Sequence, residues 1–387
     1  MGRRSGEPGE SVAWRAAETN RLDTPVVNET PPAPALRSLA AAWLGASVTG
    51  IAPLPTAGFS GSAVHEVRAG GDRFVLKELA ASTDPPRAAW VHALAGHLRA
   101  AGIAEAPDVA ATPGGDTVVA DDRGRLWELV RLVPGSATTT PTPAQAAAAM
   151  DALARIHRAA ATLPGVRRLV TPAPALALRI ERARGLLDDP WRSRRGRLPP
   201  AGSPGELATA MRSRLDAAVE TFQAATGDTV MRRVAALLPA ALPLSPALRD
   251  VWSEHVLFAA DPPDRVAGII DFHAAGMDSP AADIARLLGS WPRPGSGVDF
   301  LAAWSGALAA YEAQRPLEPA ERSAIPLLHA AGVVFGLDNW FRWVLEEGRA
   351  FPDPAAVLRR ADRLLEALPA ALQELGAIAP VSETGRI

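Results

Sequence analysis

The chain has 387 residues, 48% of them hydrophobic, and its 40 basic and 42 acidic residues give a formal net charge of -2. This length and composition allow a substantial core, in two units or in one two-lobed unit with a tail. Because the charges are interspersed and no run of 18 apolar residues occurs, we predict neither a nucleic-acid surface nor a membrane-binding patch or span.

The chain contains no cysteine, which excludes disulfides, thiolate metal sites and cysteine nucleophiles. Its first twenty residues lack the apolar run of a secretory signal. Both features favour a cytoplasmic protein. Residues 1–35 are polar, proline-rich and poor in large apolar side chains, so they cannot offset the entropy of ordering, and we expect a disordered tail.

The first folded part is rich in predicted strands. A helix is expected over residues 36–45, where apolar side chains recur at helical spacing. Gly70-Gly71-Asp72 indicates the tight turn of a hairpin, and a helix over 84–101 ends at Gly102. The strands share short apolar runs: 48–54, 62–68, 73–79, 117–120 and 126–133. They predict a small antiparallel sheet with one helix against it.

After Pro134-Gly135 the sequence becomes mostly helical. Helical spacing extends over four stretches: 142–161, 176–187, 206–225 and most of 280–376. Between them, 242–272 is a short region of strands and turns. We therefore predict an α+β chain with a β-rich N-lobe, a hinge, an α-rich C-lobe and a C-terminal tail, at residues 36–131, 132–137, 138–376 and 377–387.

Two segments of the N-lobe suit a phosphate-binding site. Gly58-Phe59-Ser60-Gly61 precedes the second strand, and glycines there let backbone N–H groups approach phosphates, although an ordinary glycine-rich turn has the same pattern. Lys77 is the only lysine in the chain and stands among apolar neighbours on the returning strand. Such a lysine needs an anionic partner, which ATP phosphates would provide, unless it reaches solvent from a strand edge.

Two carboxylates flank a short apolar hairpin in the later part of the chain. Asp250 lies in segment 249–258 and Asp271 in segment 268–272. If they converge on one point, one can accept a hydroxyl proton while the other holds a divalent metal. The alternative, that Asp250 caps a turn and Asp271 ends a strand, is equally compatible with these two segments alone.

In this order the segments resemble the aminoglycoside phosphotransferase family of protein-kinase-like small-molecule kinases. Segment 249–258 resembles that family's catalytic loop H-G-D-x-x-x-x-N. The other matching segments are Ile270-Asp271-Phe272 (its metal-binding I-D-F/W), 279–285 (its D-P-x-x-D-L-A run), 154–157 (its L-A-x-L-H helix) and 126–135 (its hinge, which ends in Pro-Gly). The resemblance spans about residues 40–345.

The resemblance implies a two-lobed protein-kinase-like fold and an ATP-dependent O-phosphotransferase acting on a small-molecule hydroxyl. Asp250 would orient or deprotonate the acceptor, and Asp271 would bind Mg²⁺. His255 stands at the second metal position, where an imidazole would suit Mn²⁺ better than Mg²⁺. Asp283 would support the catalytic loop. The residues implied in nucleotide binding are Gly58, Ser60, Gly61, Lys77 and, through their backbone, Val130, Leu132 and Val133.

The chain departs from that family's pattern at several positions. The replacements are Leu248 for His, Arg249 for Gly, His255 for Asn and His273 for the Gly after Asp-Phe. Kinases also pair the strand lysine with a Glu on the following helix, whereas the helix over 84–101 has no acid after its first residue. Its candidate polar partners are His92 and His97. A nucleotide-binding pseudokinase with a regulatory or scaffold role is therefore the alternative function.

One helical segment allows a further interpretation. Trp340 and Trp343 are three residues apart on one helical face, where they would pack into the core or line an acceptor pocket with Asp338 or Glu346 binding an amine. The core position is the favoured one. His157 is likewise expected to be a hydrogen-bonded helix residue and not a catalyst.

Overall fold

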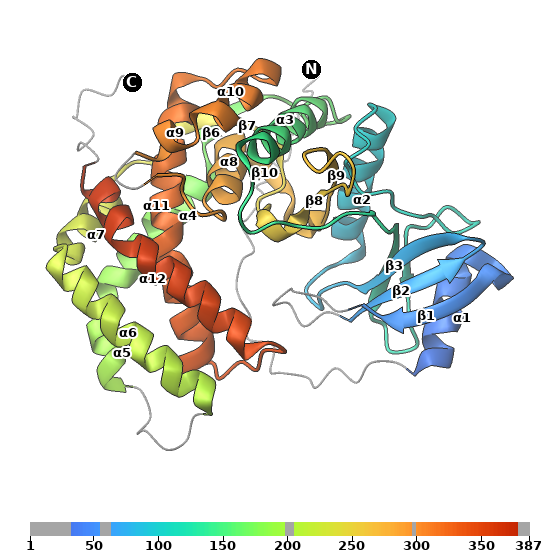
Figure 1. Cartoon of the computed structure of the whole chain (residues 1–387), viewed down its shortest axis with the longest axis horizontal. Helices are drawn as coiled ribbons and strands as arrows, with labels where there is room; N and C mark the ends of the chain where they lie inside the picture. Colours follow the sequence, from blue (N-terminus) through green and yellow to red (C-terminus); the bar gives the residue numbers. More distant parts are fainter. Residues whose placement is uncertain (1–31, 55–62, 198–204, 296–298, 378–387) are drawn as a thin grey trace, which may run out of the picture. The chain divides into compact units, whose positions relative to one another are not determined.

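The computed structural model describes residues 32–54, 63–197, 205–295 and 299–377, in which strands come first and helices dominate later (Figure 1). A five-stranded antiparallel sheet has the order β1-β2-β3-β5-β4. Its strands confirm the predicted ones within a few residues: β1 Val48–Pro53, β2 Val64–Ala69, β3 Asp72–Glu78, β4 Val118–Ala120 and β5 Leu126–Arg131. The predicted turn joins β2 to β3, where Gly70 and Gly71 have positive φ.

The alternation of side chains along β3 determines what each face of the sheet carries. Phe74 and Leu76 are buried in one cluster with Trp43 of α1 (Ala33–Leu44), a helix that begins three residues before the expected start. Lys77 follows Leu76 in sequence and therefore projects from the opposite face. Glu78 returns to the Leu76 face and is buried.

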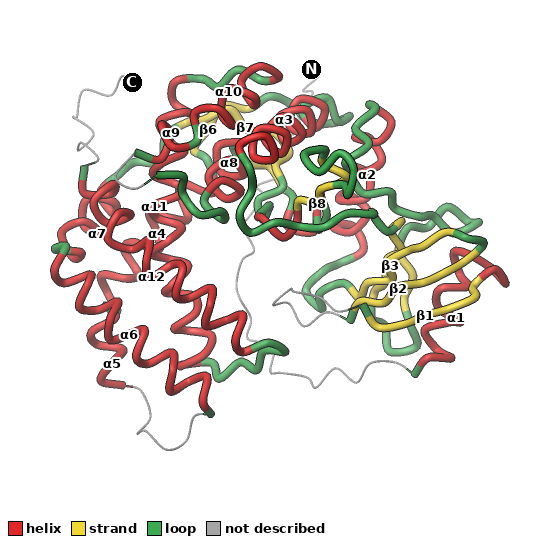
Figure 2. Tube along the Cα trace, in the orientation of Figure 1, coloured by secondary structure: helices red, strands yellow, loops and turns green. Residues whose placement is uncertain are grey.

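Helix α2 (Pro85–Ala100) forms where expected, because Asp84 caps it by accepting a hydrogen bond from the Arg87 N–H. Its buried residues Val91, Leu94 and Leu98 belong to the large cluster formed by the later helices. The sheet core instead packs on α1. The sequence predicted one helix against the sheet, whereas α1 also packs on it (Figure 2). Helix α2 contacts both β4 and α3.

The later part of the chain contains the predicted helices: α3 Pro143–Ala160, α4 Pro174–Asp188, α6 Glu206–Ala224, α8 Pro280–Leu288, α10 Ser305–Gln314, α11 Pro319–Phe341 and α12 Pro354–Gly376. The region 242–272 contains β7 (Ala241–Ala247), β8 (Val256–Phe258) and β9 (Val266–Ile269). The sequence did not predict the shorter elements α5 Trp191–Arg197, α7 Gly227–Ala236, α9 Phe300–Ala303, β6 Leu169–Pro172 and β10 Gly276–Asp278. Three short 3-10 helices and one π-helix complete the described elements: η1 (Gly45–Ser47), η2 (Ser253–His255), η3 (Phe272–Ala274) and the π-helix η4 (Arg342–Glu346).

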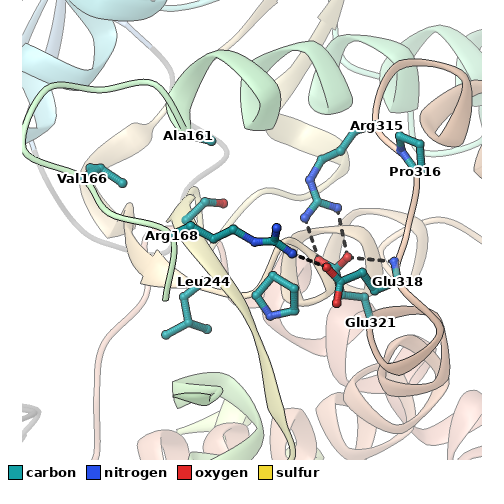
Figure 3. A pocket seen from close by; sticks show the side chains of 10 residues that line it. Ala161, Val166, Arg168, Leu244, Arg315, Pro316, Glu318 and Glu321 are labelled. Carbon is teal, nitrogen blue, oxygen red and sulfur yellow. Dashed lines mark hydrogen bonds and ion pairs between the residues drawn. The ribbon is translucent and has the colours of Figure 1, made fainter. Parts of the chain in front are cut away.

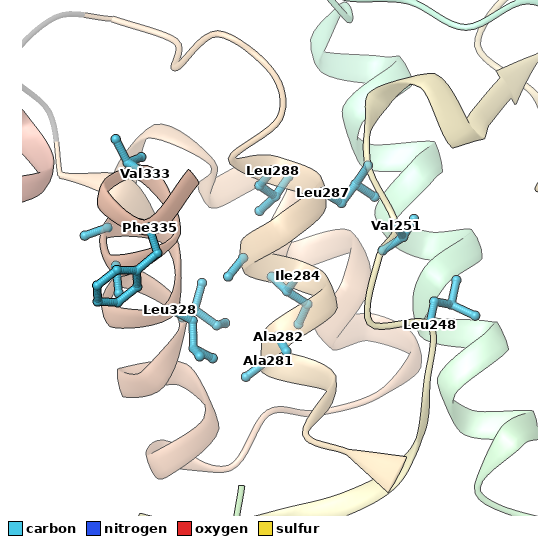
Figure 4. Packing of buried hydrophobic residues seen from close by; sticks show 14 of the residues in the cluster. Leu248, Val251, Ala281, Ala282, Ile284, Leu287, Leu288, Leu328, Val333 and Phe335 are labelled. Carbon is cyan, nitrogen blue, oxygen red and sulfur yellow. The ribbon is translucent and has the colours of Figure 1, made fainter. Parts of the chain in front are cut away.

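Helix α8 supports the loop that carries Asp250. Its residues Ile284 and Leu287 are fully buried, and Figure 4 shows them between α11 and the segment that bears Leu248 and Val251. Such close packing allows little displacement of the loop, because buried apolar side chains are packed as tightly as in crystals of small molecules.

Helix α11 and the turn η4 together form a segment, Pro319–Glu346, that is long and apolar enough to cross a membrane by composition alone. However, 67% of its most apolar window is buried inside the structure, as in a core helix. The overall class is the α+β arrangement predicted from the sequence, with the sheet before the helices.

Candidate active site

Lys77 and Asp271 meet although they are far apart in the sequence. The Lys77 Nζ lies 2.8 Å from Asp271 Oδ1. Burial alone would raise the pKa of the Asp271 carboxyl, but the charge and hydrogen bond of Lys77 outweigh it and lower the pKa below its ordinary value. A charged carboxylate and an ammonium therefore stand together where the resemblance places the phosphates and their metal.

The backbone at Asp271 has an unusual conformation. Its φ is +63°, in the left-handed region, directly before the buried Phe272. The Ile270 N–H donates to the His255 carbonyl, which joins the Asp271 segment to the catalytic-loop segment. A non-glycine residue remains in this conformation only when its surroundings enforce it, and such residues are common at functional sites.

The loop before Asp250 is held by one buried carboxylate. Asp283 is fully buried and accepts the N–H groups of Leu248 and Arg249, each at 2.6 Å. His157 Nε2 lies 2.9 Å from the same carboxylate, and its Nδ1 lies 2.8 Å from the Tyr311 hydroxyl. Asp283 thus supports the loop, and His157 is a hydrogen-bonded structural residue, as expected.

The backbone conformation of Arg249 explains why the catalytic loops that this segment resembles have glycine at the same position. Its φ is +65°, so the loop needs a left-handed residue immediately before Asp250. Glycine adopts this conformation without strain, whereas an arginine does so at a cost. The loop therefore keeps the shape expected for the family despite the substitution.

Asp250 presents a half-exposed carboxylate. Its Oδ1 accepts a hydrogen bond from Arg286 Nη2 of α8 at 2.6 Å, and 48% of its side chain is exposed. Two guanidinium groups lie over the nearby Trp252 ring, those of Arg286 at 5.8 Å and Arg360 of α12 at 5.3 Å from the ring centroid. The surroundings of Asp250 are therefore strongly basic.

Both ring nitrogens of His255 are engaged. The Trp252 Nε1–H donates to His255 Nε2 at 2.8 Å, so the proton of a neutral imidazole is on Nδ1, which donates to the Asp250 carbonyl at 2.9 Å. Burial lowers the pKa of His255, although Asp271 and Asp250 oppose that shift. The predicted metal role of His255 stays a prediction, and ligation through Nε2 would require the Trp252 hydrogen bond to break.

The donor set fits a divalent metal held mainly by phosphates. Among the described residues, no three His, Asp or Glu side chains gather into a ready-made metal cage. Mg²⁺ is usually bound through one or two carboxylates together with substrate phosphates and waters. The Asp271 carboxylate beside Lys77 suits that pattern.

The sequence analysis did not identify Glu128 of β5. It stands directly opposite Lys77 in the β3–β5 register and is 4% exposed. Its Oε2 lies 2.8 Å from His92 Nε2 and its Oε1 lies 2.7 Å from His273 Nε2. The only available signal was that both histidines stand where the family pattern breaks.

The predicted hinge, residues 132–137, follows the end of β5 at Arg131. Val130 pairs with Val75, and the Leu132 N–H donates to the Arg73 carbonyl, whereas the Val133 N–H has no backbone partner within the described ranges. A Cβ at Gly135 would lie 2.7 Å from the Phe258 carbonyl oxygen. The hinge therefore approaches β8 so closely that only glycine fits at position 135 without a displacement. The nucleotide contacts of Val130, Leu132 and Val133 stay predictions. Gly58, Ser60 and Gly61 lie outside the described residues.

Two other candidate sites have their charges already paired. Asp338 is mostly buried and accepts hydrogen bonds from Trp191 Nε1 and Arg194, so it belongs to the polar contacts around Trp191. A separate cavity of about 270 Å³ lies beside β7, where Arg168 pairs with Glu318 and Arg315 with Glu321 (Figure 3). Neither place offers an acid for a cationic acceptor.

Comparison with known sequences supports the pattern of residues described above. The family model described as the phosphotransferase enzyme family matches residues 52–317. The homoserine kinase of Caulobacter sp. (strain K31) is 30% identical over 223 residues, which are 57% of this chain and 60% of that protein. The homoserine kinase of Azorhizobium caulinodans is 29% identical over 291 residues, 74% of this chain and 80% of that protein. The chain thus matches less than two thirds of the Caulobacter protein's length.

Solved structures share the fold. A spectinomycin phosphotransferase in complex with ADP and spectinomycin has a TM-score of 0.63 at 12% identity, covering 90% of this chain and 99% of that one. An aminoglycoside phosphotransferase from Alicyclobacillus acidocaldarius has a TM-score of 0.56 at 15% identity, covering 92% and 99%. An amicoumacin kinase in complex with AMP-PNP and Ca²⁺ has a TM-score of 0.56 at 15% identity, covering 88% and 95%. The predicted kinase-like fold is confirmed.

Proposed function

The chain belongs to the phosphotransferase enzyme family, and from this premise we propose that it transfers the γ-phosphoryl group of ATP to a hydroxyl group of a small molecule in the cytoplasm. The observation that carries the proposal is the Lys77–Asp271 ion pair at 2.8 Å, with the Asp250 loop hydrogen-bonded to the Asp271 segment through His255. These contacts support a joint role for Lys77, Asp250 and Asp271 in phosphoryl transfer.

Each group has a separate task. Asp271 would hold the metal, Lys77 would bind the α- and β-phosphates, and Asp250 would orient the acceptor hydroxyl and take its proton. A bound divalent metal supplies charge neutralisation on the phosphates. The bond between the acceptor oxygen and the γ-phosphorus forms, the bond from that phosphorus to the β,γ-bridging oxygen breaks, and ADP leaves. Catalysis is mainly positioning and charge stabilisation.

The surroundings of Asp250 favour an acceptor that carries a carboxylate or another anionic group. Burial, followed by the charges of Arg286 and Arg363, lowers the pKa of Arg360 to about 10. Burial and the charge of Arg286 do the same to Arg179 of α4, again to about 10. Within the described residues, neither Arg179 nor Arg360 forms an ion pair.

Guanidinium groups that lie close together repel one another, so a bound anion stabilises them. The same groups repel a cation. Asp250 and Glu254 are the acids that act on Arg360, against the positive charges of Arg286 and Arg363. The relatives named homoserine kinases suggest one such acceptor class, a hydroxy amino acid with a free carboxylate. Aminoglycosides, which are polycations, fit this environment poorly.

A substrate panel tests the proposal. The protein is incubated with Mg²⁺ and ATP together with a hydroxy amino acid, the amide of that amino acid, in which a neutral group replaces the carboxylate, or an aminoglycoside. ADP release is measured. We expect turnover with the carboxylate compound and at least tenfold less with the amide. Preferred turnover of the aminoglycoside would contradict the anionic acceptor, and no turnover with any hydroxyl compound would contradict the kinase.

The second candidate function is a nucleotide-binding pseudokinase. Two observations favour it: Arg286 occupies Asp250 Oδ1, and both nitrogens of His255 are engaged. A pseudokinase would bind Mg-ATP without acceptor-dependent ADP release. The same panel, combined with calorimetric titration of Mg-ATP, distinguishes these two functions.

The metal role of His255 has its own test. An imidazole nitrogen favours Mn²⁺ over Mg²⁺ more than an amide oxygen does. If His255 is a ligand, His255→Asn should reduce the preference for Mn²⁺ in nucleotide binding. An unchanged ratio of Mn²⁺ to Mg²⁺ affinity would show that His255 acts only through its bonds to Trp252 and Asp250.

A further inference from the structure

Glu128 occupies a position that neither the sequence pattern nor the comparisons assign to function. We propose that it is the positioning residue of Lys77, replacing from strand β5 the acid that helix α2 lacks, and this rests on the proposed function. The carboxylate would hold the Lys77 ammonium against the nucleotide phosphates once Asp271 binds the metal.

The first support is the register of the sheet. Lys77 of β3 and Glu128 of β5 are directly opposite each other, so their side chains project from the same face. Their sequence neighbours Leu76 and Trp127 are buried on the other face with α1. The Lys77 charge is also one of the influences that lower the pKa of Glu128.

The second support is how firmly the carboxylate is held. His92 of α2 approaches one oxygen of Glu128, and its other ring nitrogen lies 2.8 Å from the Thr117 hydroxyl. His273, two residues after Asp271, approaches the other oxygen. Glu128 therefore joins α2, the sheet and the Asp271 segment, which are the three elements that must be aligned for phosphate and metal binding.

The third support is charge. Burial alone would raise the pKa of Glu128, but the hydrogen bond and charge of His273, the hydrogen bond of His92 and the charge of Lys77 lower it well below its ordinary value. The side chain is thus a buried carboxylate ion. A buried ion needs partners, and Lys77 stands directly opposite it.

The proposal also resolves a competition at Lys77. In this structure Lys77 forms an ion pair with Asp271. When the Asp271 carboxylate binds a metal, its attraction for the Lys77 ammonium is weakened. When Asp271 turns to the metal, Glu128 is the acid that remains opposite the ammonium. His273, which replaces the family's Gly, and His92, a candidate polar partner on the helix that lacks an acid, both contact this carboxylate. A role of Glu128 in holding Lys77 accounts for both contacts.

A double-mutant cycle tests the coupling. Mg-ATP affinity is measured by calorimetry for the wild type, Glu128→Gln, Lys77→Ala and the double variant. We expect Glu128→Gln to weaken affinity roughly tenfold and to raise the KM for ATP more than it lowers kcat, because a charged contact to Lys77 is lost. In the Lys77→Ala background the same change should cost almost nothing. Equal losses in both backgrounds would overturn the proposal.

A matched control separates this role from general stability. Glu78 is also a buried acid of the same sheet, 5% exposed, but it pairs with Arg125 and faces away from Lys77. Glu78→Gln should reduce thermal stability and leave Mg-ATP affinity unchanged. If Glu78→Gln and Glu128→Gln weaken nucleotide binding equally, Glu128 has no special relation to Lys77.

A second variant, in which the carboxylate is moved from β5 to α2, tests the proposal if the Glu128→Gln protein does not fold. In the double variant His92→Glu with Glu128→Gln, α2 supplies the carboxylate from the position whose ring now contacts Glu128. We expect a folded protein whose Mg-ATP affinity is within about threefold of the wild type. A folded swap variant that binds ATP tenfold more weakly would overturn the proposal. If the wild type itself binds no Mg-ATP, the proposed function fails first, and that result is separate from this one.

Discussion

At the scale of single residues, the chemistry depends on a few charges whose surroundings differ sharply. Asp271 is an ionised carboxylate beside an ammonium, whereas Asp250 is half-exposed and paired with a guanidinium. The first arrangement suits metal and phosphate binding, and the second suits a group that must exchange partners with an acceptor. The two carboxylates thus have different roles because their neighbours differ.

The role of Asp271 predicts the behaviour of Asp271→Asn. Asparagine tolerates the left-handed backbone of this position, so the fold should persist. The neutral amide is a poor ligand for Mg²⁺, so metal-dependent ATP binding should be lost. Calorimetry with and without Mg²⁺ measures both effects, and an unchanged Mg-ATP affinity would show that Asp271 is not the main ligand.

The role of Arg360 predicts a selective effect on the acceptor. Arg360→Met keeps an extended side chain near Trp252 but removes the charge, so the KM for a carboxylate acceptor should rise roughly tenfold or more while the KM for ATP stays unchanged. The adjacent Arg359 is 64% exposed and pairs with Asp353, so Arg359→Met is a matched control that should alter neither constant. Equal acceptor KM values in both variants would argue against the anionic site.

At the scale of elements, the hinge is fixed by how closely it approaches β8. The Ser136 and Phe258 backbones exchange hydrogen bonds at 2.9 Å in both directions. Gly135 lies beside this pair, and any side chain there would displace either the hinge or the hairpin. The hinge geometry, and with it the predicted adenine contacts of residues 130–133, therefore depends on a single glycine.

Substitution of that glycine gives a clear expectation. Gly135→Ala should lower the free energy of unfolding by about 1–3 kcal/mol, because its Cβ would lie 2.7 Å from the Phe258 carbonyl. Gly96→Ala in α2 meets nothing within 4 Å and should stabilise the protein by roughly 0.5–1 kcal/mol. Denaturant unfolding of both variants measures the difference, and a neutral Gly135→Ala would show that the hinge can move away from β8.

Element-scale contacts also show what the sequence was able to predict. The five strands, the main helices, Lys77 and Asp271 were predicted because short-range patterns specify them. Glu128 was missed because its position opposite Lys77 depends on the pairing of β3 with β5, which no local pattern shows. The arginines near Asp250 were missed for the same reason, since they come from α8 and α12.

At the scale of the whole molecule, the larger of two hydrophobic clusters joins α2 to the later helices, while the smaller one joins the sheet to α1. The groups that we propose for phosphoryl transfer come from both the sheet and the later part of the chain, and ion pairs connect the two. The contacts that join the sheet to the helical part are therefore polar at the site, as in Lys77–Asp271 and Glu128–His273. Such contacts can be exchanged for contacts with a nucleotide.

Acid sensitivity of the folded chain should depend on His329 of α11. Burial, with the charge of Arg293, lowers its pKa to about 3, so the unfolded chain takes up this proton near pH ~6.5 and the folded chain does not. Stability is therefore lost as the pH falls below about 6.5, by up to ~1 kcal/mol per pH unit because part of the ring still contacts solvent. His329→Gln should flatten the unfolding free energy between pH 7 and 5. If the free energy of unfolding of that variant falls equally steeply with pH, other groups cause the acid sensitivity.

The central claim is that Asp250 and Asp271 carry out phosphoryl transfer to a small hydroxyl compound. The most direct measurement is the formation of phosphorylated acceptor and ADP by wild type and Asp250→Asn under saturating Mg-ATP and a carboxylate-bearing alcohol. We expect one phosphoester per ADP in the wild type and a rate ~10²–10⁴ lower in the variant, with nucleotide affinity unchanged. Wild-type turnover by Asp250→Asn, or tight Mg-ATP binding by the wild type with no phosphoester on any acceptor, would contradict the account.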